Sequence, residues 1–145
     1  MALPSVRLLT TAVQDLLAAA PAGLTRYTTL VDPAPPVDDA GVVTAYAVLH
    51  PYAGNDTANN LAVNPGQILW GFQIDCGGGD ATYLLWAVDT VRGLLSGQTL
   101  TVAGAKVGRL QPPLGYNPPT RPELNVTPPR ITVPLQYQVL AVSSS

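Results

Sequence analysis

The sequence predicts an α+β fold: a mainly antiparallel or mixed sheet, two amphipathic helices packed on one face, and a long proline-rich loop. Two stretches place apolar residues three and four positions apart, which is typical of helices buried on one side. Several others alternate or are rich in β-branched and aromatic residues, which favours strands. The order helix, strands, strand–helix, strands is that of an α+β protein. The length of 145 residues and the lack of an internal repeat indicate a single domain, residues 1–145.

The first helix is expected to begin at Pro4 or Ser5 and to run to about Ala20. A basic residue, an apolar run and a small-residue stretch imitate a signal peptide here, but Gln14 and Asp15 interrupt the run. We therefore interpret this stretch as an amphipathic helix of the fold. Its apolar stripe consists of Val6, Leu9, Val13, Leu16, Leu17 and Ala20.

Two strands and a long connection are expected next. Residues 25–31 are β-branched and aromatic, and residues 42–50 alternate, so both predict strands. The proline- and aspartate-rich connector between them, residues 32–41, is incompatible with regular structure. Residues 51–67 predict a long loop that joins strand 42–50 to strand 68–76 as a wide antiparallel hairpin.

The stretch 68–97 is the best-specified unit, and the rest of the chain is organised around it. Strand 68–76 alternates between Ile68, Trp70, Phe72 and Ile74 on its apolar face and more polar residues on the other. Residues 77–79, all glycine, are expected to turn the chain at positive φ. Asp80 is then the N-cap of a helix that ends near Gly97. The apolar stripe of that helix is Leu84, Leu85, Val88, Val91, Leu94 and Leu95.

The C-terminal part predicts more sheet. Residues 99–102 and 106–110 favour a short hairpin, and residues 131–142 favour a closing strand in which Pro134 marks an edge or a bulge. The helical and strand periods together predict a core made of Val6, Leu9, Leu16, Tyr46, Val48, Trp70, Phe72, Leu84, Val88, Val91 and Tyr137.

Residues 111–130 contain seven prolines and predict an extended arm. Because proline lacks an amide donor, the arm is not expected to join a sheet along its length. Its apolar and basic residues are expected to contact a neighbouring subunit, with Tyr116 as the main anchor. The alternative is a loop folded back over its own sheet. The interface residues predicted in this arm are Leu114, Tyr116, Arg121, Leu124 and Arg130.

The composition points to an assembly. Only 11% of residues are charged and the mean hydropathy is +0.22, whereas a typical soluble domain carries about 25% charged residues. A surface short of charge favours a subunit that buries much of it over a small monomer covered by proline and small polar residues. The net charge of −2 provides no footprint for nucleic acid, and no apolar window is long enough to span a membrane. The single cysteine excludes an internal disulfide framework and fits a reducing compartment.

Candidate catalytic groups are few. The glycines at 77–79 could cradle a phosphate before a helix, but no lysine follows, and Asp75 and Asp80 would repel it, so a strand-to-helix turn is preferred. Cys76 and His50 could form a nucleophile and base, with Asp75 or Asp80 orienting the imidazole, yet no oxyanion-hole motif accompanies them. The sequence thus predicts no enzyme, and a small Cys/His hydrolase is the less favoured alternative.

Two polar loops are candidates for calcium binding. One contains Asp32, Asp38 and Asp39, and the other contains Asn55, Asp56, Asn59 and Asn60. Neither has the alternating ligand spacing of an EF-hand loop. We therefore predict solvated loops, with no metal and no cofactor.

The order of the elements resembles a known family. An amphipathic N-terminal helix precedes a strand pair with a long loop, and WGFQIDCGGGD then leads into a helix that ends VRGLL. After a proline-rich connection, PPRITVPLQYQVLA closes the sheet. This arrangement, over nearly the full length, resembles the tail terminator proteins of long-tailed bacteriophages (siphophages), particularly the actinophage type.

The resemblance implies a structural virion protein without catalytic residues, located at the tail-neck and assembled in the host cytoplasm. Such a protein forms a hexameric ring that caps the tail tube, stops its polymerisation and joins it to the head connector. The partners implied are other copies of the chain, the tail tube protein and the connector. DNA would pass through the ring without sequence-specific contacts. The alternative within this class is another neck or tail component, such as a head–tail joining protein or a tube subunit.

Overall fold

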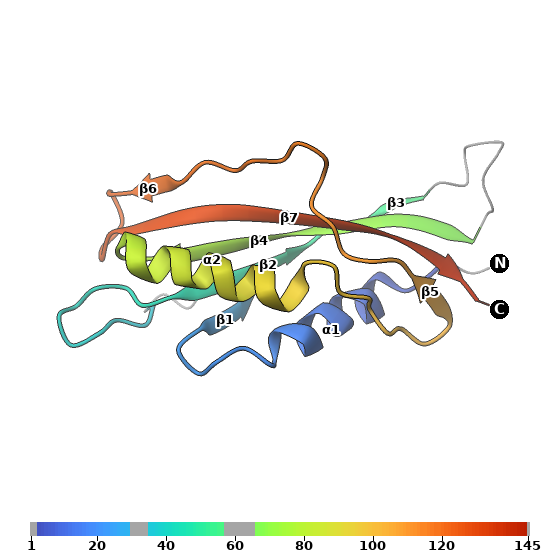
Figure 1. Cartoon of the computed structure of the whole chain (residues 1–145), viewed down its shortest axis with the longest axis horizontal. Helices are drawn as coiled ribbons and strands as arrows, with labels where there is room; N and C mark the ends of the chain where they lie inside the picture. The colour runs from blue at the N-terminus through green and yellow to red at the C-terminus, as the bar shows by residue number, and fades with distance from the viewer. Residues whose placement is uncertain (1–2, 30–34, 57–65, 145) are drawn as a thin grey trace.

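The computed structural model describes residues 3–29, 35–56 and 66–144. The described residues form one seven-stranded sheet, and the two helices among them lie on the same face of it (Figure 1). The strand order is β1-β2-β4-β7-β5, with β3 paired to β4 and β6 paired to β7. Strand β1 is parallel to β2, and the other described pairs are antiparallel. This mixed sheet with two helices confirms the predicted α+β class. The elements are α1 (Val6–Leu17), β1 (Thr25–Thr28), β2 (Tyr46–Pro51), β3 (Asn55–Asp56), β4 (Gln67–Gly78), α2 (Ala81–Leu95), β5 (Ala105–Val107), β6 (Arg121–Glu123) and β7 (Arg130–Ser143).

The first two elements are shorter than predicted. Helix α1 is capped by Ser5, whose side chain accepts a hydrogen bond from the Leu8 amide at 3.2 Å, but it ends at Leu17 instead of near Ala20. Strand β1 ends at Thr28 because Thr29 adopts a φ of 66°, a left-handed conformation that breaks an extended strand. Residues 30–31, which the prediction included, lie outside the described residues.

The predicted hairpin of strands 42–50 and 68–76 is confirmed as β2 and β4, with Tyr46 opposite Gly77 and Pro51 opposite Phe72. Strand β2 nevertheless begins at Tyr46 and not at Val42. The residues before it are held by other partners, since Val43 bridges Val37 and its carbonyl accepts from the Gly79 amide at 2.7 Å. Within the expected loop, β3 pairs with β4, while residues 57–65 lie outside the described residues.

The long antiparallel pair β4–β7 is the centre of the fold, running from Gln67 opposite Val142 to Gly78 opposite Ile131. Alternate residues of both strands face the helices. Of the predicted core, the following are buried there: Leu9, Trp70, Phe72, Leu84, Val88, Val91 and Tyr137. Val6 and Leu16 are only partly buried against this core. Tyr46 and Val48 are buried on the opposite face with Val43, because β2 alternates and turns Ala47 and Leu49 toward the helices.

The predicted reason for the three glycines is wrong. None of Gly77, Gly78 and Gly79 has a positive φ, and the first two belong to β4. What requires glycine here is close approach. A Cβ on Gly77 would lie 2.3 Å from the Tyr46 ring, and one on Gly78 would lie 2.7 Å from the Leu84 amide nitrogen. The Tyr46 ring beside Gly77 and the first turn of α2 beside Gly78 therefore leave no room for a methyl group.

Helix α2 has the predicted boundaries. The Asp80 carboxylate accepts from the Tyr83 amide at 2.9 Å as N-cap, and Gly97 follows the helix with a φ of 74°. The predicted short hairpin survives as isolated bridges, Thr99 to Arg109 and Val102 to Ala105. Of its second half, only residues 106–107 belong to a strand, β5, which pairs with β7.

The proline-rich segment 111–130 folds back along its own sheet, which is the alternative that the sequence left open. Figure 1 shows the chain between β5 and β6 running alongside β7. Gln111 exchanges both backbone hydrogen bonds with Gln138, at 3.2 and 2.9 Å, and β6 pairs with the start of β7. The prolines between these two points interrupt the pairing, so the segment joins the sheet only locally.

Candidate functional site

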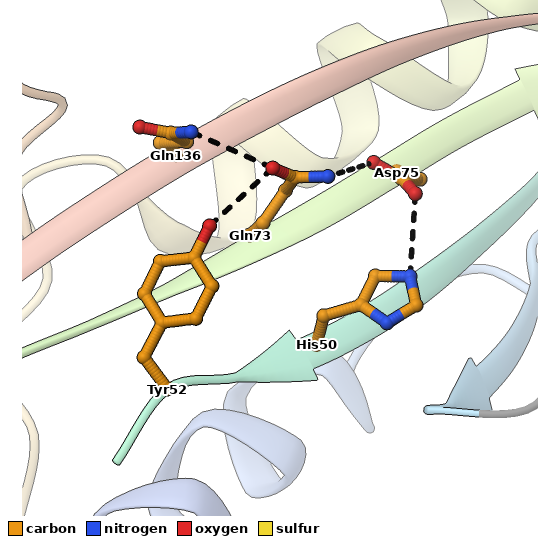
Figure 2. A network of polar contacts seen from close by, with 5 residues as sticks. All are labelled: His50, Tyr52, Gln73, Asp75 and Gln136. Atoms are coloured by element: carbon orange, nitrogen blue, oxygen red, sulfur yellow. Dashed lines mark hydrogen bonds and ion pairs between the residues drawn. The ribbon is translucent and has the colours of Figure 1, made fainter. Parts of the chain in front are cut away.

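Polar side chains from three neighbouring strand regions meet on the sheet face that points away from the helices (Figure 2). His50 Nε2 lies 3.2 Å from Asp75 Oδ2. The Gln73 amide donates to Asp75 Oδ1 at 2.8 Å. In turn, Gln73 Oε1 accepts from the Tyr52 hydroxyl at 3.3 Å and from the Gln136 amide at 3.5 Å. The network thus connects the end of β2 to β4 and β7.

The contacts of this network are weak one by one and together link three strand regions. The His50 and Asp75 side chains are 36% and 30% exposed, so solvent screens their attraction, which contributes less than about 1 kcal/mol. The acceptors of Asp75 and Gln73 are already engaged within the network. A ladder of amide and carboxylate contacts across three strand regions fixes their register and leaves a polar, rigid patch.

The structure brings together only part of the candidate catalytic group. His50 and Asp75 are in contact, as the sequence allowed, but Asp80 caps α2 instead. Cys76 is fully buried in the core on the helix side of β4, whereas Asp75 and His50 lie on the other side. The nucleophile–base pair of Cys76 and His50 is therefore wrong, because consecutive strand residues point to opposite faces. Burial also raises the pKa of the Cys76 thiol to about 12, so it stays protonated at neutral pH.

The buried thiol predicts a pH-dependent stability. Its pKa is about 12 in the folded chain and ordinarily 9.0, so the unfolded chain loses this proton first as the pH rises. The stabilisation is fully present below about pH 9 and declines between pH 9 and 12, by about 1.4 kcal/mol per pH unit. We expect the stability advantage of the wild type over Cys76→Ala to shrink between pH 8 and 10.5 in urea unfolding. An advantage that stays constant or grows over this range would contradict the prediction.

The acidic connector has a structural role. Asp38 Oδ1 accepts from the amides of Ala40 and Val42, both at 2.9 Å, and its Oδ2 accepts from the Tyr83 hydroxyl at 2.9 Å. The hydrogen bond from the Val42 amide, and then that from Tyr83, lower the pKa of Asp38. This carboxylate ties the connector to α2, and three hydrogen bonds from its own chain occupy most of its acceptor positions. Asp32, Asn59 and Asn60 lie outside the described residues. Within the described residues, no three His, Cys, Asp or Glu side chains are grouped to hold a metal ion.

The predicted interface residues of the arm fall into two groups. Tyr116 is held within its own chain, since its hydroxyl donates to the Pro134 carbonyl oxygen at 2.6 Å. Arg130 also contacts its own chain, donating to the Pro128 carbonyl at 3.3 Å. Leu114 is fully exposed and Leu124 is 77% exposed, while Arg121 is exposed in β6. The arm thus carries internal anchors and outward apolar side chains side by side.

Two grooves lie on opposite sides of the described chain. The outer-face groove, of about 430 Å³, is lined by Tyr52, Leu69, Gly71, Pro113, Gln136 and Gln138, among others. The α1–β1 groove, of about 490 Å³, lies between α1 and the edge strand β1. Its lining includes Gln14, Leu17, Ala22, Leu24, Arg26 and Thr28. Both are open depressions, a shape that fits a contact with another macromolecule better than an enclosed small-molecule site.

Sequence reasoning missed several residues of these surfaces. Tyr52, Gln73 and Gln136 looked unremarkable as single polar residues, and only the pairing of β4 with β7 brings Gln73 opposite Gln136. Register of this kind is set over the whole sheet and leaves no local signal.

None of the helices in the described part of the chain has the length and hydropathy needed to cross a membrane.

The fold is similar to that of known structures, although no protein-family model and no curated protein sequence matches this chain. One similar structure is a chain in the virion of a native gene transfer agent particle. The TM-score is 0.67 at 17% identity, over 94% of this chain and 96% of that chain. A second solved structure, of a protein without a functional name, has a TM-score of 0.52 at 20% identity, over 97% of each chain. Over nearly its whole length, therefore, this chain shares its fold with a chain found in the virion of a gene transfer agent particle.

Proposed function

We propose that this protein is a structural component of a phage-like virion, and within it the tail terminator. In this role a ring of copies caps the tail tube, stops its polymerisation and presents a surface to the head connector. The observation that carries the proposal is the similarity of fold, over 94% of the chain, to a chain of a gene transfer agent virion. The finer assignment as a tail terminator rests in addition on a resemblance to that family, in the order of the elements and in the segments around 70–95 and 129–141.

The surface of the subunit supports assembly. Apolar side chains are exposed on the outer sheet face and on the arm, among them Tyr52, Leu69, Leu114, Leu124 and Leu140. Only 11% of its residues are charged, so electrostatic repulsion does little to oppose the association of such a surface with another molecule. We propose that Leu114, Leu124 and Arg121 contact a neighbouring subunit or the tube. Tyr116 and Arg130 hold the arm in place for that contact.

A structural role without catalysis is part of the proposal. The partners are further copies of the chain, most simply six in a closed ring, together with the tail tube protein and the head–tail connector. The location is the tail-neck of the virion, after assembly in the host cytoplasm. DNA passes through the ring without sequence-specific contacts, and no cofactor takes part.

The test is a tube-capping assay. Tail tube protein of the same particle is polymerised alone and with increasing amounts of this protein, and tube lengths are measured by electron microscopy. We expect shorter tubes with a ring at one end, because a bound ring occupies the surface to which the next tube subunit adds. The matched control is the protein with Leu114 and Leu124 both replaced by aspartate, which should fold and cap less well.

Three other results have definite meanings. Unchanged tube lengths and bare ends at molar excess would overturn the tail terminator assignment. Incorporation along the whole tube would identify a tube subunit instead. Binding only to isolated head connectors would identify a head–tail joining protein.

A further inference from the structure

The sheet edge beyond β7 is protected against the addition of another strand. Three parts of the chain lie along it: β5, Gln111 and β6. Because Gln111 exchanges both backbone hydrogen bonds with Gln138, every second residue of β7 counted from Gln138 directs its backbone groups toward this edge. Pro134 is one of them, and it has no amide to donate. Its carbonyl accepts from the Tyr116 hydroxyl at 2.6 Å, so the gap between Gln111 and β6 offers no continuous row of partners.

The strands that cover this edge are protected in turn. By the same alternation Thr132 directs its backbone groups toward β6, where Arg121 lies opposite it, so the neighbouring Pro122 is turned to the outer side. A proline there presents no donor, which is a common way of protecting a sheet edge. Residues 99–102 run beside β5, to which an isolated bridge joins them.

Strand β1 forms the opposite edge of the sheet and lacks this protection (Figure 1). Among the described residues it pairs only with β2. The amides of Thr25 and Thr29 donate to carbonyl groups along the β2 segment, at 3.2 and 2.7 Å. The residues between them in the alternation, Arg26 and Thr28, therefore direct their N–H and C=O groups away from β2. The strand contains neither proline nor lysine, so its edge is open to pairing.

The α1–β1 groove runs along this open edge and suits an extended peptide. Its lining surface is mainly polar, as expected where a strand leaves backbone groups in solvent. Gln14 donates to the Thr28 hydroxyl at 3.0 Å, which holds α1 against β1 and preforms the groove. Arg26 is exposed, and among the described residues it forms no ion pair. Since the lining contains Arg26 but no aspartate or glutamate, its charge favours a segment that carries a carboxylate.

A second copy of this chain is a poor occupant of the edge. A ring built by edge pairing needs two complementary edges in each subunit, and the edge beyond β7 is blocked. Two copies of β1 that met across a two-fold axis would bring their Arg26 side chains to the same face, and the contact would end at a dimer. The open edge therefore fits a different protein.

We propose that the open edge of β1 receives an extended, carboxylate-bearing segment of a different protein as an added strand. The outward backbone groups of Arg26 and Thr28 provide the main-chain hydrogen bonds, and the Arg26 guanidinium pairs with the carboxylate. That this other protein belongs to the virion rests on the proposed function, whereas the site itself does not.

Fluorescence anisotropy with synthetic peptides tests the charge preference. The probe is a short labelled peptide that alternates glutamate and valine, and its counterpart has lysine in place of glutamate. We expect the wild type to bind the acidic peptide at least about tenfold more tightly than the basic one. Arg26→Glu should reverse this order. On binding, amide hydrogen exchange should slow at Arg26 and Thr28, while Thr25 and Thr29, already bonded along β2, should change little.

A matched pair of variants tests the addition of a strand. Thr28→Pro should abolish binding, because proline removes the outward donor and places its ring on the edge. Thr28→Ala also loses the hydroxyl that accepts from Gln14 but keeps the amide, so it should retain most of the affinity. Equal melting temperatures would show that the two variants are equally folded. With the wild type, methylation of one of the two alternate sets of peptide amides should abolish binding, and methylation of the other set should not.

Other outcomes would overturn the inference. Equal binding to Thr28→Pro and Thr28→Ala, together with equal binding of both methylated peptides, would exclude strand addition. Equal affinity for the acidic and basic peptides, or no binding of either at about 1 mM, would remove the site. A wild-type dimer that Thr28→Pro dissociates would place a second copy at the edge instead. Tube capping is independent of these results: a protein that binds the peptide but does not cap tubes keeps this site and loses the tail terminator role, and the reverse result removes only the site.

Discussion

Replacing Trp70 by alanine should lower the free energy of unfolding by about 3–5 kcal/mol, which is among the largest losses available in this chain. Trp70 is fully buried at the centre of β4, opposite Val139 of β7. Its ring centroid lies 5.3 Å from that of Phe72, and its indole nitrogen donates to the Tyr52 carbonyl at 2.8 Å. Alanine leaves a cavity between sheet and helices and removes that donor. Urea unfolding would measure the loss, and the melting temperature should fall by roughly 10 °C or more.

Two adjacent leucines of α2 provide a matched test of this link between the burial of a side chain and the loss of unfolding free energy. Leu84 is 2% exposed and faces the core, whereas Leu85 is 56% exposed. Leu84→Ala should cost about 2–5 kcal/mol, and Leu85→Ala should cost less than about 1 kcal/mol. Similar losses at the two positions, or a loss below about 1 kcal/mol at Trp70, would show that the faces of these elements are wrongly assigned.

The elements with strong local signals were predictable. The period of α2, its Asp80 cap and Gly97 after its end are all encoded within a few residues, and the structure has them where the sequence predicts them. The start of β2 was not, because Val42 and Val43 have the residue types of a strand but are bonded to the connector and to Gly79. Tertiary partners override β-propensity at such positions.

The candidate site was predictable only in part. His50 and Asp75 are both polar residues of the predicted hairpin, and its register, with His50 opposite Gln73, makes them diagonal neighbours on one face. Strand alternation places Cys76 and Asp75 on different faces of β4. The exclusion of Cys76 from the candidate site could therefore have been predicted from the sequence. The contact between Gln73 and Gln136 could not have been predicted, since it depends on the register between β4 and a strand about sixty residues later.

The surface against which the arm lies could not be predicted from the sequence either. Seven prolines indicate an extended segment, but they do not say against which surface it lies. The decisive contacts are single ones, the Gln111 pairing with Gln138 and the Tyr116 hydroxyl on Pro134. Contacts of this kind, between a loop and a distant strand, carry no periodic signal. They also show why proline content alone did not distinguish a free arm from one that covers the edge of its own sheet.

Gly78→Ala should destabilise the chain by about 2–3 kcal/mol or more, although it adds only one methyl group. The added Cβ would lie 2.7 Å from the Leu84 amide nitrogen and 3.0 Å from the Tyr83 carbonyl carbon, and these backbone atoms belong to the first turn of α2. Relief requires the helix to move away from β4, which would loosen the packing of Leu84 in the core.

The matched control is Gly93→Ala, the same substitution inside α2, where an added Cβ meets nothing within 4 Å. It should stabilise the chain by up to about 1 kcal/mol, because alanine has the higher helix propensity. The two variants should therefore shift the urea midpoint in opposite directions, while circular dichroism reports the same helix content for both. A neutral Gly78→Ala would mean that the strand and helix are not in contact at this junction. The glycines would then have to be explained by backbone conformation, as the sequence alone suggested, and not by the close approach that fixes α2 against β4 in this fold.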